Sequence, residues 1–343
     1  MKKSLSVLLA LALVFSAIMA VSAQDKTYLE RAYDGEFKGT EVIFDGPFMD
    51  SDQVLFEESI AEFEKKTGID IVYIGNKDFE STVLMRVESG NAPDIMDFPQ
   101  PGLMANLAKG GHLVDVREIV SEDWLKENYS QAWLDLAMTP GPDGEEMMAG
   151  IWARFNAKSQ VYYRPAVWAD AGYEIPETWD EMIELSKQMV EDGETPWCAG
   201  VESGSATGWP GTDWIENIML RTTSLENYDK WTKGELKFDS PEVRRAMELL
   251  GEIWFTDGFV YGGREAIAAT NFGEAVKPLF FETDGCMMYM LGNFVTAFFP
   301  EGLTPGEDYD VFYLPPIDEE YGRPYLGGGD IYGVPAGDRK SVV

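Results

Sequence analysis

The segment Gly208–Trp214 (GWPGTDW) places Trp209, Asp213 and Trp214 within a stretch marked by Gly and Pro. These markers favour a loop that opens a helix at Ile215–Leu220, and aromatic rings on loops are often available for binding. Sugars present apolar C–H faces and rims of hydroxyl groups, so aromatic rings can stack on them while carboxylates and amides form paired hydrogen bonds. The segment indicates a small-ligand site of this kind, with a place in the hydrophobic core as the alternative for Trp214.

The other candidates are aromatic, carboxylate, amide and guanidinium side chains. Asp50 and Asp52 are suited either to meet ligand hydroxyls or to cap the following helix. Arg154 stands among apolar neighbours, and a surface ion pair is its alternative role. Asp330 follows a run of glycines, which lets backbone and carboxylate approach a ligand together, although a tight turn explains the pattern as well. The candidate ligand-binding residues are Phe48, Asp50, Asp52, Phe98, Arg154, Trp209, Asp213, Trp214, Asn293, Phe294, Gly329 and Asp330.

Residues for nucleophilic, metal or nucleotide chemistry are sparse. His112 is the single histidine and lies in the loop-like segment Gly110–Leu113, where surface placement is expected. The chain contains no G-x-S-x-G elbow, Walker A motif or dinucleotide fingerprint, and zinc sites built on several His or Cys are excluded. No catalytic residue, metal or cofactor is therefore expected. A secreted glycoside hydrolase or lyase stays as an alternative, because 60 acidic residues leave room for its two carboxylates.

Strand and helix patterns alternate through residues 40–98 and must position the first candidates. Strands separated by helices favour parallel pairing with right-handed crossovers. Ligands bind beyond the carboxyl ends of such strands, which places the loops Asp45–Asp52 and Phe98–Gly102 at a binding edge. The expected strands are Thr40–Phe44, Ile69–Ile74 and Asp94–Phe98. The first helix is expected to be capped by Ser51 or Asp52, to end at Gly68 and to carry the buried stripe Phe56, Ile60 and Phe63. The second helix is expected to run through Val83, Leu84 and Val87 to Gly90.

The stretch Val161–Val190 carries the strongest local signals. Val161–Tyr163 predicts an aromatic strand, and the Pro- and Gly-marked residues 165–176 predict a loop. Thr178 and Glu181 form a capping-box pattern, in which the hydroxyl accepts a hydrogen bond from a backbone N–H and the carboxylate reaches back. A helix with apolar residues at helical spacing is expected to follow.

This stretch resembles a signature of the extracellular solute-binding proteins, family 1, which are the sugar-binding components of bacterial ABC importers. Arg164 stands where the family usually has Asn. The segment Gly208–Trp214, with Pro196–Cys198 before it, is similar to the α-glucoside-binding branch of the family. Further segments that resemble family motifs, in the family's order, are Phe63–Gly68 (FEKKTG), Ala92–Met96 (APDIM), Phe280–Phe294 (FFETDGCMMYMLGNF), Tyr309–Pro316 (YDVFYLPP) and Gly327–Asp330 (GGGD).

The resemblance implies an α/β architecture with two lobes, the periplasmic-binding-protein fold in its type II-like form, joined by hinge strands. The first crossing between lobes is expected near Arg154–Val161, and the return near Tyr325–Tyr332. The expected domains are lobe 1 at 24–157, lobe 2 at 158–326 and a return crossing toward lobe 1 at 327–343. Family members usually continue with further helices, so the C-terminal part is expected to be missing.

The same resemblance implies a function. The chain is expected to capture a carbohydrate, an α-glucoside or another oligosaccharide, between its lobes and to deliver it to the permease subunits of an ABC importer, as a monomer and without enzymatic activity. The lobes are expected to close by hinge bending. The family commonly presents an aromatic ring to the sugar where Phe98 stands, and a Trp where Phe294 stands after Asn293.

The net charge limits the kinds of partner that the protein can bind, and the cysteine content indicates whether it forms a disulfide. A formal net charge of −33 argues against a nucleic-acid partner, because phosphate binding requires clustered Lys and Arg. The same acidity leaves a polyamine or another cation as an alternative ligand for the transport fold. The only two cysteines, Cys198 and Cys286, suggest one disulfide in an exported protein.

Residues 1–23 have the pattern of a secretory signal. Basic residues precede the apolar run Leu5–Ala20, and a small-residue site predicts cleavage after Ala23. A membrane anchor is the alternative, which the short apolar run disfavours. The mature protein is therefore expected to be periplasmic or extracellular.

Overall fold

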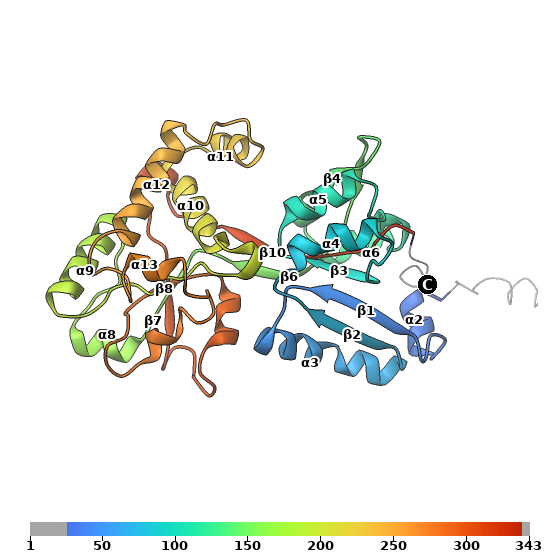
Figure 1. Ribbon diagram of the computed structural model, residues 1–343, viewed down its shortest axis with the longest axis horizontal. Helices are drawn as coiled ribbons and strands as arrows, with labels where there is room; N and C mark the ends of the chain where they lie inside the picture. Colours follow the sequence, from blue (N-terminus) through green and yellow to red (C-terminus); the bar gives the residue numbers. More distant parts are fainter. Residues whose placement is uncertain (1–25, 338–343) are drawn as a thin grey trace, which may run out of the picture.

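The computed structural model describes residues 26–337, which form two α/β lobes arranged along the long axis of the molecule (Figure 1). The predicted secretory signal and its cleavage site lie outside the described residues. Within residues 26–337, none of the helices has the length and apolar character that crossing a membrane requires.

Lobe 1 is built on a five-stranded sheet with the strand order β2-β1-β3-β10-β6. β1 is parallel to β2 and β3, which confirms the predicted strand–helix–strand pattern, whereas β10 is antiparallel to β3 and β6. The elements are β1 (Glu41–Gly46), β2 (Asp70–Gly75), β3 (Ile95–Phe98), β6 (Ile151–Ala157) and β10 (Gly327–Gly333), the antiparallel pair β4 (Met138–Pro140) and β5 (Glu146–Met148), and the helices α2 (Tyr28–Tyr33), α3 (Asp50–Thr67), α4 (Phe79–Glu88), α5 (Pro101–Lys109), α6 (Glu122–Asn128) and α7 (Gln131–Leu136).

Lobe 2 surrounds a smaller antiparallel sheet with the order β8-β7-β9. The helices α8 and α9 lie at the end of the lobe that is far from lobe 1, whereas α10 lies nearer the hinge strands and packs against α12 (Figure 1). The elements are β7 (Gln160–Tyr163), β8 (Tyr289–Met290), β9 (Asp310–Tyr313), α8 (Pro165–Ala171), α9 (Trp179–Glu191), α10 (Trp209–Thr222), α11 (Leu225–Thr232), α12 (Pro241–Trp254) and α13 (Arg264–Ile267), with the short 3-10 turns η2 (Gly204–Ala206) and η4 (Asn293–Phe298).

Each lobe has a hydrophobic core of its own. The core of lobe 1 gathers Phe79, Phe98 and Trp152 between the sheet and its helices, and the core of lobe 2 gathers Trp197 and Trp214 with residues of α9, α10 and α12. A further aromatic cluster in lobe 2 contains the predicted disulfide. Cys198 and Cys286 are bonded with their Cα atoms 5.5 Å apart, which confirms that prediction.

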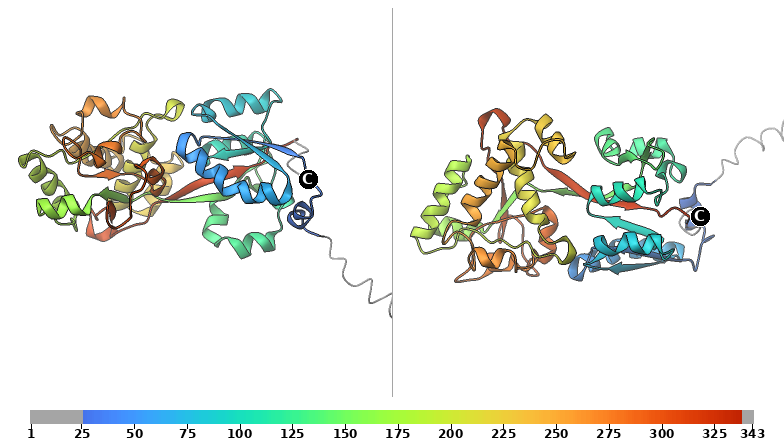
Figure 2. Two further views of the ribbon diagram at one scale, coloured as in Figure 1. Left: turned by 90° about the horizontal axis from the view of Figure 1, so that it is seen from below. Right: turned by 45° about the horizontal axis from the view of Figure 1, so that its top comes forward.

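The strands β6 and β10 run side by side toward lobe 2 and form the hinge (Figures 1 and 2). β6 continues through Lys158 and Ser159 into β7, so one chain segment serves both sheets. The pairing is tight at Gly329, where a Cβ atom would lie 1.9 Å from the carbonyl oxygen of Arg154. Gly329 is therefore required for the two hinge strands to approach each other.

Several local predictions need correction. Residues 165–176 are not a continuous loop, because Pro165 opens helix α8 at the first position, where its missing N–H costs nothing. For the same reason α10 begins at Trp209 with Pro210 in its first turn, not at Ile215. Neither Ser51 nor Asp52 caps α3; its N-cap is Met49 without a side-chain bond, and the acids lie in the first turn, where the helix dipole favours them.

Other local predictions are confirmed. Gly68 ends α3 with φ of 73°, a left-handed conformation that glycine adopts without strain. The expected buried stripe is met only in part, because Phe56, Ile60 and Phe63 are half-buried. The capping box is formed at the start of α9, where Thr178 and Glu181 bond each other's backbone N–H groups.

Candidate ligand-binding cleft

A cleft of about 750 Å³ lies between the lobes and is bounded by the two hinge strands. Lobe 1 contributes the β1–α3 loop and the start of α4, and lobe 2 contributes η2, the first turns of α10 and residues of η4. The lobes touch at the edge of the cleft, where the Ser205 hydroxyl donates to the carbonyl oxygen of Lys77 at 3.4 Å. The charged lining residues are the acids Asp50, Asp52, Glu80, Glu202, Asp213, Glu216, Glu274 and Asp330 and the bases Lys77, Arg154 and Lys158.

Arg154 on β6 is the centre of a charged network at the hinge. Its guanidinium donates to Asp330 on β10 at 2.7 Å and to Asp52 on α3 at 2.8 Å. The group also lies over the ring of Phe48 at 4.2 Å and near the ring of Phe294, which belongs to lobe 2, at 5.7 Å. Burial lowers the pKa of Arg154, but the two carboxylates outweigh it and raise the pKa above its ordinary value. Arg154 therefore stays charged and connects α3, both hinge strands and the lobe 2 side.

A second network fastens α10 to the end of β6. The Lys158 ammonium donates to Asp213 Oδ1 at 2.9 Å, and the Asn217 amide donates to the Lys158 carbonyl oxygen at 3.0 Å. The Ser159 hydroxyl donates to Asn217 Oδ1 at 2.6 Å. These bonds hold the carboxylate of Asp213 in a fixed position beside the hinge.

Glu216 lies one helical turn after Asp213 and also lines the cleft. Burial raises the pKa of Glu216 to about 7, and the nearby Asp213 carboxylate adds to the rise. Lys158 and a hydrogen bond from the Tyr228 hydroxyl, at 3.3 Å, act in the opposite direction. The charge of this wall therefore changes close to neutral pH.

Aromatic rings form the apolar part of the cleft lining. The Trp209 ring centre lies 5.0 Å from that of Phe272 and 5.7 Å from that of Phe294. Phe298 extends the group, with its ring centre 5.3 Å from that of Phe272. Trp209 is half-buried, so part of its ring remains exposed. Apolar faces thus stand beside charged groups within one cleft.

Most of the predicted site residues meet in this cleft. Those that line it are Phe48, Asp50, Asp52, Arg154, Trp209, Asp213, Phe294, Gly329 and Asp330. Arg154 is bonded to Asp52 and Asp330, and Asp213 is bonded to Lys158, which the sequence alone did not indicate. The contacts of Asp52 with Arg154 and of Lys158 with Asp213 join residues 102 and 55 positions apart.

Three predicted site residues do not line the cleft. Phe98 is fully buried against Phe79 in the core of lobe 1, because β3 directs it to the helix-covered side. Trp214 is 4% exposed and packs on Trp197 in the core of lobe 2. Five residues after Trp209 the helix has turned by about 140° from the first position, so the two rings face different ways. Asn293 accepts a hydrogen bond from the Ala157 N–H at 2.8 Å and so supports the hinge.

The sequence reasoning missed several polar residues of the cleft. Asn156 and Lys158 lie on the lining together with Arg154. The polar residues at 154, 156 and 158 repeat with the period of two that a strand gives to one face, so this alternation was a readable signal. Glu216 follows Asp213 at helical spacing, which was readable only once the helix was placed from Trp209 onward. Across residues 26–337, no group of three or more His, Cys, Asp or Glu is arranged to hold a metal ion.

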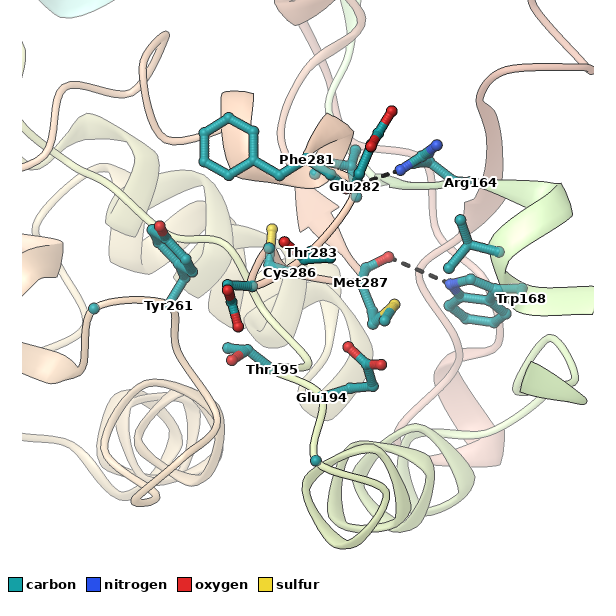
Figure 3. Close-up of a pocket in the computed structure, with 16 residues that line it drawn as sticks. Arg164, Trp168, Glu194, Thr195, Tyr261, Phe281, Glu282, Thr283, Cys286 and Met287 are labelled. Atoms are coloured by element: carbon teal, nitrogen blue, oxygen red, sulfur yellow. Dashed lines mark hydrogen bonds between the residues drawn. The ribbon is translucent and has the colours of Figure 1, made fainter. Parts of the chain in front are cut away.

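A second crevice, of about 540 Å³, lies within lobe 2 (Figure 3). Its polar groups are partly engaged already: the Arg164 guanidinium donates to the Phe281 carbonyl oxygen at 3.1 Å, and the Trp168 indole donates to the Met287 carbonyl oxygen at 3.3 Å. The loop that borders it, residues 281–284, is exposed. This crevice contacts neither the hinge nor lobe 1, so the cleft between the lobes is the better candidate site.

Comparison with known sequences places the chain in one family. A family model described as bacterial extracellular solute-binding protein matches residues 50–342. The osmoprotective compounds-binding protein GgtB of Synechocystis sp. is 41% identical over 320 residues, which cover 93% of this chain and 73% of that protein. The alpha-glucosides-binding periplasmic protein AglE of Rhizobium meliloti is 40% identical over 300 residues. That match covers 86% of this chain and 65% of AglE, slightly less than two thirds of its length.

Solved structures confirm the predicted two-lobed α/β fold. The bacterial solute receptor AcbH matches with a TM-score of 0.72 at 19% identity, covering 88% of this chain and 75% of that chain. RafE in complex with raffinose matches with a TM-score of 0.68 at 18% identity, covering 88% of this chain and 76% of that chain. At these identities the likeness establishes the fold alone.

Proposed function

Because the chain belongs to the bacterial extracellular solute-binding proteins, we propose that it captures an α-glucoside or another oligosaccharide between its lobes and delivers it to the permease subunits of an ABC importer. The observation that carries the proposal is the cleft itself. It lies at the hinge between the lobes and combines aromatic faces with fixed polar groups, which is the composition that a sugar requires. Its volume of about 750 Å³ is within the range of small-ligand sites.

Individual residues are assigned roles within this proposal. Trp209, supported by Phe272 and Phe294, stacks on the apolar face of a sugar ring. Asp213 accepts a hydrogen bond from a ligand hydroxyl. Arg154 fixes the relative positions of the hinge strands and the β1–α3 loop, which border the bound ligand. No residue is assigned a catalytic role, because capture and release require no bond to be broken.

Within this proposal the mature protein is exported and acts as a monomer. The sequence pattern of residues 1–23 supports a periplasmic or extracellular location after cleavage at Ala23. The relatives GgtB and AglE are named for binding osmoprotective compounds and alpha-glucosides, respectively, and those names support a small polar solute. A monomer suffices, since both walls of the cleft come from one chain.

A cationic ligand is the second candidate, and the charge of the cleft favours it. The acidic lining residues outnumber the basic ones, and two of the three bases are ion-paired to carboxylates within the lining. A polyamine would gain from this excess of negative charge. Its binding would weaken steeply with salt, whereas the binding of a neutral sugar would not.

Calorimetric titration of the mature chain with maltose, trehalose, sucrose and spermidine separates these candidates. Saturable binding of a sugar that is insensitive to salt, with no product formed, is the expected result. Trp209→Ala is expected to weaken that binding by about tenfold or more, because the stacking face is lost. Trp124→Ala is the matched control, since Trp124 is an exposed tryptophan outside the cleft. If spermidine binds and none of the sugars does, the ligand is a cation and not a sugar. Release of glucose during the titration would indicate an enzyme.

A further inference from the structure

We infer that Asn156 and Asp213 form a subsite of two hydrogen-bond acceptors at the hinge, which recognises a pair of hydroxyl donors on the ring that Trp209 stacks. The inference rests on the proposed sugar-binding function and adds the residues that decide which hydroxyl groups are read. Asn156 is a residue that the sequence did not single out.

The observation behind this subsite is a pair of unsatisfied atoms. Within the described chain, Asn156 Oδ1 and Asp213 Oδ2 are buried and have no hydrogen-bond partner. Both side chains are largely buried, at 5% and 3% exposure for the residues, and both line the cleft. The other buried unpartnered side-chain atoms belong to Asp45, Asp97, Trp152 and Trp179, none of which lines the cleft.

Both atoms are acceptors, and this decides the chemistry of the partner. An amide oxygen and a carboxylate oxygen can be satisfied only by a donor, such as a hydroxyl or an N–H group. A buried acceptor without a partner is unfavourable, so a ligand that supplies the donor recovers that free energy on binding. A site built in this way rejects an analogue that lacks the donor, because the buried atoms then stay unpaired.

The carboxylate of Asp213 is held in place beside the strand that carries Asn156. Asp213 Oδ1 is bonded to Lys158, which follows Asn156 by two residues along the same strand direction. The Asn217 amide bonds the Lys158 carbonyl oxygen at 3.0 Å, which holds α10 against the end of β6. Asp213 therefore needs no rearrangement of α10 before it meets a ligand.

Trp209 stands where it can position the ring above the subsite. It precedes Asp213 by four residues on α10, and residues at this spacing lie on the same helix face. A ring stacked on Trp209 would thus direct its edge toward Asp213 and the adjoining hinge strand. Since Asn156 belongs to the hinge, this contact would also tie ligand recognition to the segment about which the lobes move.

Deoxyfluoro sugars test the subsite directly, because fluorine keeps the size of a hydroxyl but cannot donate a hydrogen bond. The probe is the tightest binder among maltose, trehalose and sucrose, each of which carries an α-D-glucopyranosyl ring, together with its monodeoxyfluoro derivatives on that ring. Calorimetry is expected to show that substitution at two positions weakens binding to the parent protein by about tenfold or more. If no position loses affinity on fluorination, the inference is overturned without any variant.

Variants then assign each hydroxyl to its acceptor. In Asn156→Ala, one of the two fluorination penalties is expected to disappear, and in Asp213→Asn the other is expected to shrink, whereas Asn156→Asp keeps an acceptor and keeps its penalty. Thr212→Ala is the matched control, because Thr212 lines the cleft beside Asp213 but is exposed. Thermal unfolding checks that each variant is folded; Asn156→Ala removes an unsatisfied acceptor and is expected to unfold no earlier than the parent.

The outcomes separate the subsite from the proposed function. Penalties that are unchanged in both variants overturn the subsite while sugar binding itself stands. Failure of the folded parent protein to bind any of the three sugars overturns the capture of these α-glucosides and the subsite together. Loss of both penalties in Thr212→Ala would show a general disturbance of α10 and would also overturn the assignment.

Discussion

Opening the Cys198–Cys286 disulfide is expected to lower the free energy of unfolding of lobe 2 by about 4–5 kcal/mol. The bonded residues are 88 positions apart. In the chain-entropy relation, a closed loop of this length removes about 15 cal/mol/K from the unfolded state, which gives about 4.6 kcal/mol at 25 °C. The bond therefore acts mainly on the unfolded chain, and the native contacts of the two sulfur atoms add little to this figure.

The assay is equilibrium unfolding of the mature chain in guanidinium chloride, with and without dithiothreitol. Reduced parent protein keeps every atom of the side chains, so its difference from the oxidised protein isolates the crosslink. Cys198→Ala combined with Cys286→Ala is a second comparison, expected to lose somewhat more, because both residues are 4% exposed and their truncation leaves small cavities. Tryptophan fluorescence reports both lobes, since Trp133 lies in lobe 1 and Trp197 in lobe 2.

Two results would refute this reasoning. A loss below about 1 kcal/mol on reduction would mean that the unfolded chain is not restricted by the loop as the entropy relation requires. An equal loss in the transition of lobe 1 would mean that the two lobes unfold as one unit, because the 88-residue loop lies entirely in lobe 2.

Further predictions use the same unfolding assay. Burial raises the pKa of Glu216 from 4.5 to about 7. The folded state therefore binds a proton on this group more tightly than the unfolded state does. The resulting contribution to the free energy of unfolding is complete below pH 4.5 and falls by up to about 3 kcal/mol as the pH rises through 7. Glu216→Gln should flatten this dependence, and identical pH profiles would contradict it. Arg154→Met leaves the buried Asp330 carboxylate without its cation and is expected to destabilise by about 3–5 kcal/mol; an unchanged midpoint would show that the pair is dispensable. Thr178→Ala removes the cap that accepts from the Glu181 N–H at 3.2 Å, with an expected loss of about 1 kcal/mol, and no loss would exclude a stabilising cap.

The sequence predicted lobe 1 well where one signal dominated. The strands β1 and β2 are apolar runs flanked by glycines, β3 lies between Pro93 and Pro99, and the helices between these strands end at Gly68 and close to Gly90. Proline caused the main errors in lobe 2. Pro165 and Pro210 were read as loop markers, but each occupies the first turn of a helix, where proline is compatible with helical geometry. Local spacing does not distinguish these two uses of proline.

The residue types of the site were predictable from the sequence, but which of these side chains face the cleft was not. Trp209 and Asp213 were found because aromatic and acidic residues stand out near glycine and proline. Phe98 and Trp214 were equally prominent in sequence, yet tertiary packing places both in the cores. Which side of a strand or helix faces a cleft depends on the elements packed against the other side, and that information is not local. Asn156 belongs to the polar alternation at 154, 156 and 158, and that signal points to the cleft only once β6 is known to border it.

The electrostatics of the cleft also bear on the enzymatic alternative. Hydrolysis of a glycosidic bond by two carboxylates needs one protonated acid and one free nucleophile or base. Glu216, with its pKa of about 7, has the properties of the acid. The carboxylates nearby are engaged otherwise: Asp213 is paired with Lys158, and Asp52 and Asp330 share the guanidinium of Arg154. Such pairing suits groups that hold a ligand still, so prolonged incubation with maltose is expected to release no glucose, and measurable release that Glu216→Gln abolishes would reverse this conclusion.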